Sequence, residues 1–189
     1  MRTTQDDTRE NMQIKLFNLD ALSGRSNKYI PDATLEVKNK IHKIELKTCD
    51  VNRKQVSTAR NVTLNKIEEW KKVLWIFSSY KKNEAGPILV EHYLGNSKML
   101  NEWFEKQAEK IKNGTKTYAG LDLWTKASSI LEEHFDNSEL ERLNNSYYRK
   151  GSGLNDPKIS WSYIENNCIK LNLDDLENDL RKQISLLSD

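Results

Sequence analysis

Asp32 and, thirteen positions later, Glu45-Leu46-Lys47 are the residues whose types and spacing most directly point to chemistry. Carboxylates and backbone carbonyls are hard oxygen ligands of the kind that Mg²⁺ prefers, and Mg²⁺ fills its remaining positions with waters and phosphate oxygens. A lysine beside such an ion stabilises the negative charge that develops on a phosphodiester during hydrolysis, or helps to deprotonate the attacking water. The pattern therefore predicts a Mg²⁺ site with Asp32, Glu45 and the carbonyl of Leu46 as ligands. Lys47 is then the catalytic lysine.

The segment between the two acidic residues has the pattern of a β-hairpin. If Lys38-Asn39 forms a two-residue turn, the numbers of paired residues sum to 77, which sets Asp32 directly opposite Glu45. Directly opposed residues of a hairpin place their side chains on one face. Side chains two positions apart on a strand also share a face, so Lys47 joins them. The hairpin thus predicts that two carboxylates and an ammonium converge.

The same residues also have an interpretation without chemistry. Charged residues make up 31% of the chain, so an Asp followed at a distance by Glu-x-Lys arises often by chance. Glu36-Val37-Lys38 repeats the Glu-x-Lys pattern at a place that leaves no room for a hairpin after Asp32. The alternative is a solvated ion-pair face on a two-stranded edge, which contributes little to stability. The spacing alone leaves both interpretations open.

Hydrophobic periodicity predicts a sheet in the first half of the chain and helices in the second. The expected strands cover residues 33–37, 41–48, 73–79 and 88–94. The expected helices cover residues 5–22, 63–72, a segment that begins near residue 97, 121–135, 138–147 and 174–187. The predicted fold class is therefore α/β (α+β), with a sheet core over 1–96 and a mainly helical extension over 97–189.

Length and composition are those of one ordinary globular domain. The chain has 189 residues with only 7 Gly, 3 Pro and 2 Cys, which excludes collagen-like and disulfide-scaffold classes. The formal net charge of +2 means that any nucleic-acid binding depends on local clusters of basic residues. Cys49 and Cys168 are far apart and have no metal-binding spacing, as expected of reduced thiols in a cytoplasmic protein. We expect no signal segment, no membrane span and no nucleotide cofactor, because the sequence shows no long apolar stretch and no Gly-rich phosphate loop.

Further segments with a recognisable order follow the Glu-Leu-Lys strand. They are a Ser-Thr-led segment, an amphipathic helix, a strand that ends Trp-Ile-Phe, and a Pro-Lys-Ile segment near the C-terminus. With these segments the sequence resembles the type II restriction endonucleases of the PD-(D/E)xK superfamily, most closely their PvuII-like branch. The segments that carry the resemblance are Glu45-Leu46-Lys47-Thr48, Val56-Ser57-Thr58-Ala59-Arg60-Asn61-Val62-Thr63, Trp70-Lys71-Lys72, Val73-Leu74-Trp75-Ile76-Phe77 and Asn155-Asp156-Pro157-Lys158-Ile159.

The resemblance implies a restriction-endonuclease-like fold, in which a central mixed β-sheet is flanked by helices and residues 97–189 complete a DNA-binding cleft. It implies Mg²⁺-dependent hydrolysis of phosphodiester bonds at a short palindromic site in double-stranded DNA, by a homodimer. Asp32 and Glu45 match the metal ligands of the family, and Lys47 matches its catalytic lysine. The residues that the resemblance places at the DNA are Ser57, Thr58, Arg60, Asn61, Asn155, Asp156 and Lys158.

The recognised bases are expected to differ from those of the PvuII-like enzymes, because Ala59-Arg60-Asn61 replaces three consecutive histidines. Arg60 suits bidentate pairing with guanine, and Asn61 or Asn155 suits adenine. Phosphate contact or simple solvation is the alternative interpretation for each of them. Two alternatives to a restriction enzyme stay open: a structure-specific or repair nuclease of the same fold, such as a junction resolvase, and a non-catalytic DNA-binding protein.

Overall fold

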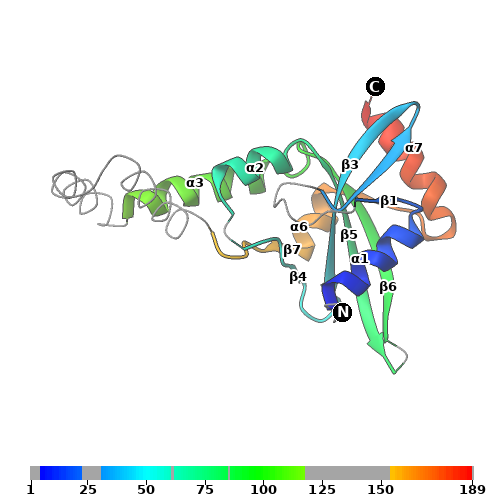
Figure 1. Ribbon diagram of the computed structural model, residues 1–189. Helices are drawn as coiled ribbons and strands as arrows, with labels where there is room; N and C mark the ends of the chain where they lie inside the picture. The colour runs from blue at the N-terminus through cyan, green and yellow to red at the C-terminus, as the bar shows by residue number, and fades with distance from the viewer. Residues whose placement is uncertain (1–4, 23–30, 61, 85, 118–153, 189) are drawn as a thin grey trace, which may run out of the picture. The chain divides into compact units, whose positions relative to one another are not determined.

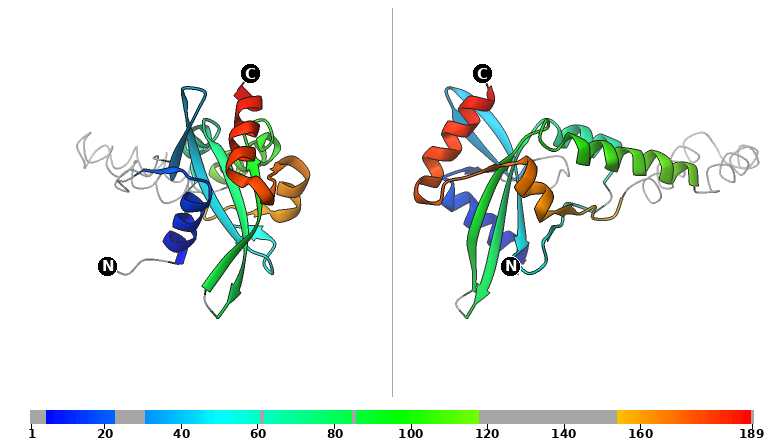
Figure 2. Two further views of the ribbon diagram at one scale, coloured as in Figure 1. Left: turned by 90° about the vertical axis from the view of Figure 1, so that its right-hand side faces the viewer. Right: turned by 180° about the vertical axis from the view of Figure 1, so that it is seen from behind.

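A computed structural model describes residues 5–22, 31–60, 62–84, 86–117 and 154–188 of the chain (Figures 1 and 2). The chain divides into two compact units, which we call the sheet unit and the second unit. The sheet unit comprises residues 1–58, 68–102 and 158–189, and the second unit comprises residues 59–67 and 103–157. Of the helices in the described residues, none has the length and apolar character needed to cross a membrane.

A mixed sheet of six strands forms the centre of the sheet unit, in the order β1-β2-β3-β5-β6-β8. Only β3 and β5 run parallel, and the other neighbours are antiparallel. The strands are β1 (Asp20–Ala21), β2 (Ala33–Val37), β3 (Lys40–Asp50), β5 (Leu74–Asn83), β6 (Gly86–Gly95) and β8 (Ile169–Lys170). The predicted mixed α and β character is confirmed, and so are the four expected strands. The two-residue strands β1 and β8 were not predicted, since two residues are too few to show an alternating pattern.

The hairpin between β2 and β3 has the predicted register. Lys38 and Asn39 lie at φ 51° and 61°, the left-handed conformation that a two-residue type I′ turn requires. The pairs run from Val37 with Lys40 to Ala33 with Ile44, so their numbers sum to 77 as expected.

Helices cover both faces of this sheet. α1 (Gln5–Leu16) and α7 (Leu176–Ser188) lie on one face, and α6 (Trp161–Asn167) lies on the other (Figure 2). The first face carries a buried apolar cluster to which β2, β3, β5, β6 and α7 all contribute. On the opposite face, Tyr93 of β6 packs edge-on against Trp161 of α6 at 5.5 Å between ring centroids. The strands at the centre of the sheet are therefore buried on both sides.

The sheet unit also contains a separate two-stranded ladder. β4 (Gln55–Val56) pairs antiparallel with β7 (Ile159–Ser160). The remaining elements are α2 (Leu64–Trp70), α3 (Asn101–Thr117) and a short 3₁₀ helix η1 (Leu173–Asp175). The expected helices over 121–135 and 138–147 lie outside the described residues.

Candidate active site

Beyond Ile44, the residues of β3 are no longer paired with β2. The pairing of β2 with β3 stops at Ala33 and Ile44, so the expected direct pair of Asp32 with Glu45 does not form. Asp32 lies in a bend, and its backbone N–H donates to the carbonyl of Ile44 at 3.0 Å. Past this point, the backbone N–H of Leu46 donates to Oδ2 of Asp32 at 2.7 Å. The carboxylate thus takes the place of a strand partner, and this hydrogen bond fixes Asp32 beside the Glu-Leu-Lys strand.

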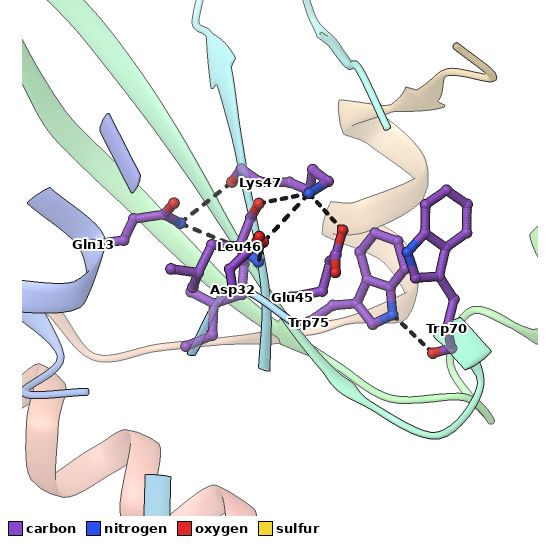
Figure 3. Close-up of polar contacts among 8 residues, drawn as sticks. Gln13, Asp32, Glu45, Leu46, Lys47, Trp70 and Trp75 are labelled. Carbon is purple, nitrogen blue, oxygen red and sulfur yellow. Dashed lines mark hydrogen bonds and ion pairs between the residues drawn. The ribbon is translucent and has the colours of Figure 1, made fainter. Parts of the chain in front are cut away.

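The ammonium of Lys47 lies where three oxygen atoms converge (Figure 3). Its Nζ is 2.7 Å from Oε1 of Glu45, 2.9 Å from the carbonyl oxygen of Leu46 and 3.5 Å from Oδ2 of Asp32. The side chains of Asp32, Glu45 and Lys47 are 23%, 8% and 15% exposed. The prediction that two carboxylates and an ammonium converge is therefore confirmed in the structure, and the group is largely withdrawn from solvent.

Burial and the two carboxylates shift the pKa of Lys47 in opposite directions. Burial alone disfavours an ammonium, but the negative charges of Glu45 and then Asp32 outweigh it and raise the pKa of Lys47 above its usual value. A smaller contribution in the same direction comes from Glu10 of α1. The lysine is therefore held as a cation in a site that supplies more negative than positive charge.

Aromatic rings adjoin the acidic side of the site. Glu45 of β3 lies opposite Trp75 of β5, and Trp75 stacks on Phe77 with 5.6 Å between centroids. The indole N–H of Trp75 donates to the carbonyl of Trp70 at 3.2 Å, which satisfies the buried donor (Figure 3). Because apolar surroundings strengthen electrostatic interactions, charges at Glu45 act more strongly here than they would in water.

A polar pocket of about 170 Å³ opens beside the lysine. Lys47 and Thr48 of β3 meet Ser57 and Thr58 there, and the residues that complete the lining are Glu10, Gln13 and Leu46. A larger hollow of about 280 Å³ lies among Thr8, Arg9, Lys82, Asn83, Gly86 and Pro87. The described lining of that hollow includes no carboxylate, whereas the smaller pocket is lined by Lys47 and Glu10.

Sequence reasoning missed the two pocket residues that come from α1. Glu10 and Gln13 are three positions apart and share a helix face. The segment was interpreted through its apolar stripe alone, and the stripe gives no reason to single out a glutamine. Gln13 is nevertheless completely buried. Before the structure, its only mark in the sequence was a polar residue between apolar ones.

The structure brings together some of the predicted DNA-binding residues. Pairing of β4 with β7 places Ser57 next to Lys158, whose Nζ donates to the hydroxyl of Ser57 at 2.6 Å. Ser57 and Thr58 also line the pocket that contains Lys47. These three residues therefore belong to the sheet unit together with Asp32, Glu45 and Lys47.

The other predicted DNA-binding residues are in the second unit. There the backbone N–H of Asp156 donates to the carbonyl of Ala59 at 2.9 Å, and Val62 pairs with Leu154. These bonds hold the exposed side chains of Arg60 and Asn155 on adjacent segments. Asn61 lies outside the described residues.

The three oxygen atoms around the lysine are a chemically suitable set for a hard divalent cation. Two carboxylates and a carbonyl already surround one positive charge, which is the donor type that Mg²⁺ takes. No cluster of three or more His, Cys, Asp or Glu side chains suited to a metal occurs in the described part of the chain. Any metal here would thus depend on two carboxylates, the Leu46 carbonyl and ligands from solvent or substrate.

The sequence was also compared with known proteins. No protein-family model matches it, and no curated protein matches it at a significant level.

Proposed function

We propose that this protein is a Mg²⁺-dependent endonuclease that hydrolyses phosphodiester bonds in double-stranded DNA, and that it is a type II restriction endonuclease of the PD-(D/E)xK superfamily. The observation that carries the proposal is the convergence of Asp32, Glu45 and the Leu46 carbonyl on the ammonium of Lys47. The strand that bears this group is part of a mixed sheet flanked by helices, which supports a restriction-endonuclease-like fold.

Each residue of the group has a separate role in this proposal. Asp32, Glu45 and the carbonyl of Leu46 hold the metal. When bound, Mg²⁺ polarises a phosphoryl oxygen and lowers the pKa of a coordinated water. Lys47 places a positive charge where the non-bridging oxygens of the attacked phosphate gain negative charge, and a preorganised charge of this kind lowers the barrier.

The polar pocket supports a nucleic-acid substrate. Ser57 and Thr58 line it beside Lys47, and Lys158 is fixed against Ser57. Hydroxyls and an ammonium are ordinary phosphate ligands, so this edge would hold the DNA backbone. Arg60, Asn155 and Asp156 would then read bases or contact neighbouring phosphates, with arginine suited to guanine.

The substrate also implies an oligomeric state. A duplex presents two antiparallel strands with equivalent phosphates, and the part of the chain that the structure describes carries one candidate active site. A pair of subunits related by a two-fold axis meets a palindromic site with one active site for each strand. We therefore propose a homodimer, and a protein that stays monomeric on DNA by mass measurement in solution would overturn this part of the proposal.

Digestion of plasmid and phage DNA tests the proposed function. Purified protein is incubated with Mg²⁺ or with EDTA, and Lys47→Ala is assayed in parallel. Discrete bands that need both Mg²⁺ and Lys47 are the expected result, and sequencing of the ends gives the site and the cut.

Other outcomes would favour the alternatives. Cleavage of branched DNA without regard to sequence would favour a junction-resolving or repair nuclease of the same fold. Duplexes that are bound but stay intact under all conditions would favour a non-catalytic DNA-binding protein.

A further inference from the structure

A buried glutamine ties the helix on one face of the sheet to the backbone of the catalytic strand. Gln13 of α1 is 0% exposed. Its Nε2 lies 3.3 Å from the carbonyl of Lys47 and 3.3 Å from the carbonyl of Ile76, on the parallel strands β3 and β5 (Figure 3). The same nitrogen lies 2.8 Å from the hydroxyl oxygen of Ser78. One amide group thus spans the two strands at the position of the catalytic lysine.

The amide nitrogen of Gln13 is the donor in each of these three hydrogen bonds. A side-chain NH₂ group has two donors and no acceptor, so the two carbonyls and the Ser78 oxygen share its protons. The Ser78 oxygen, which accepts from Gln13, also forms a hydrogen bond of 2.8 Å with Nδ1 of His92. His92 is 2% exposed, and burial lowers its pKa to about 4. The imidazole is thus neutral at this place, and its Nδ1 is bonded to the Ser78 hydroxyl.

The nitrogen of the Gln13 amide makes three hydrogen bonds, whereas its oxygen makes none. Its Oε1 is buried and has no hydrogen-bond partner, although a buried acceptor without a partner costs free energy. The amide is thus placed to satisfy the strand carbonyls and Ser78 rather than its own oxygen. Lys47 lies in the same pocket that Gln13 lines, and α1 contacts β3 along this stretch.

We propose that Gln13 is a positioning residue for Lys47. The effect of Gln13 on catalysis is the part of this inference that rests on the proposed function. Asp32 accepts a hydrogen bond from the N–H of Leu46 at the edge of the strand. Gln13, which comes from the helix α1, donates to the carbonyl of Lys47. Ser78 and His92 fix the amide in turn. The backbone of Leu46 and Lys47 is therefore restrained by two hydrogen bonds. These restraints keep the Lys47 ammonium close to Asp32 and Glu45.

Three variants of α1 test this role. Gln13→Met keeps most of the side-chain volume and removes both donors. Gln13→Glu keeps an oxygen at Oε1 and removes at least one donor. Ile14→Ala, on the same helix, loosens apolar packing against the core cluster and leaves the hydrogen bonds in place. All three are compared with wild type below their melting temperatures, under single-turnover conditions with Mg²⁺ and a duplex that wild type cleaves.

We expect both Gln13 variants to lower the rate of the chemical step by about 10- to 100-fold with little change in the KM for DNA, as is usual when a group that orients an active-site residue is lost. Ile14→Ala is expected to lower the melting temperature without this loss of rate. A wild-type rate in Gln13→Met would overturn the proposal. So would full activity in Gln13→Glu alone, or an equal loss of rate in Ile14→Ala.

Amide hydrogen exchange in the metal-free protein separates this inference from the proposed function. Gln13→Met is expected to lose protection at Lys47 and Thr48 while the amides of β6 keep theirs. If wild type cleaves no DNA, the proposed function fails, and the exchange data still decide the positioning role. Unchanged protection at Lys47 in Gln13→Met would overturn it.

Discussion

At the scale of single residues, the protein keeps one histidine neutral inside its sheet. His92 of β6 is hydrogen-bonded to Ser78 through Nδ1 and packs edge-on against Phe17, with 5.1 Å between ring centroids. Burial is the main cause that lowers its pKa to about 4, and the opposing effect of Glu91 is smaller. The folded protein therefore binds a proton at His92 less tightly than the unfolded chain does.

This difference predicts how stability depends on pH. Because the folded pKa is below the ordinary value of 6.5, the contribution of His92 to stability is complete above about pH 6.5 and is lost as pH falls toward 4. The loss amounts to at most about 3 kcal/mol. Urea unfolding from pH 4 to 7 should show it in wild type, and His92→Asn, which keeps an acceptor near Nδ1 but does not titrate, should show a shallower dependence. Parallel curves for the two proteins would contradict this assignment.

The sequence predicted those residues of the candidate site whose positions follow from pairing within one hairpin. Asp32, Glu45 and Lys47 came from residue type and hairpin register, and both are local properties of the sequence. Gln13 depends on contacts with β3 and β5, which are more than thirty positions away. Nothing in the sequence near Gln13 shows which carbonyls its amide will meet.

At the scale of elements, the turn between β2 and β3 decides where Asp32 lies. A one-residue slip would move every side chain of β2 to the other face and separate Asp32 from Glu45. Lys38 adopts φ 51°, a conformation that costs a residue with a Cβ about 1 kcal/mol or more. The hairpin therefore holds its register with a residue that is not well suited to the turn.

Replacing that residue should stabilise the protein. Lys38→Asn puts a residue that tolerates left-handed φ at the first turn position, and we expect the free energy of unfolding to rise by about 0.5–1 kcal/mol. Urea unfolding measures the change. The matched control is Lys40→Asn, an exposed position on the strand outside the turn, where no gain is expected. An equal effect of the two substitutions would show that turn geometry is not the cause.

Element boundaries were less predictable than the hairpin. The first helix was expected to run to residue 22 but ends at Leu16. Asn18 takes φ 50°, and the N–H of Leu19 bonds the carbonyl of Ile14 at 2.9 Å, the pattern of a Schellman cap. Leu19 continues the apolar stripe by packing in the core after the helix has ended, so periodicity alone overstates the helix length.

At the scale of the whole molecule, the proposed binding to DNA depends on where the charge lies. The formal net charge is only +2, so affinity for a polyanion must come from local clusters. The pocket edge with Lys158 beside Ser57 is one such place. A lysine that contacts phosphate contributes to binding through release of counterions, and this contribution has a defined dependence on salt.

Lys158 therefore gives a prediction for DNA affinity. Lys158→Gln should weaken binding to all duplexes and reduce the slope of log K against log salt by about 1. Fluorescence anisotropy at several salt concentrations, with Ca²⁺ in place of Mg²⁺ to prevent cleavage, measures the slope. Lys182→Gln on the exposed side of α7 serves as the control and should leave the slope unchanged. The same slope for Lys158→Gln and wild type would remove Lys158 from the DNA interface.

The central claim is that Lys47 acts in phosphodiester hydrolysis and does not merely balance buried charge. The most direct measurement is the single-turnover cleavage rate of a duplex with Mg²⁺ for wild type, Lys47→Met and Lys43→Met. Lys43 lies on the same strand and the same face but is exposed, which makes it a matched control. We predict a loss of about 100-fold or more for Lys47→Met and a wild-type rate for Lys43→Met. Equal rates for Lys47→Met and wild type, with both proteins folded, would contradict the account.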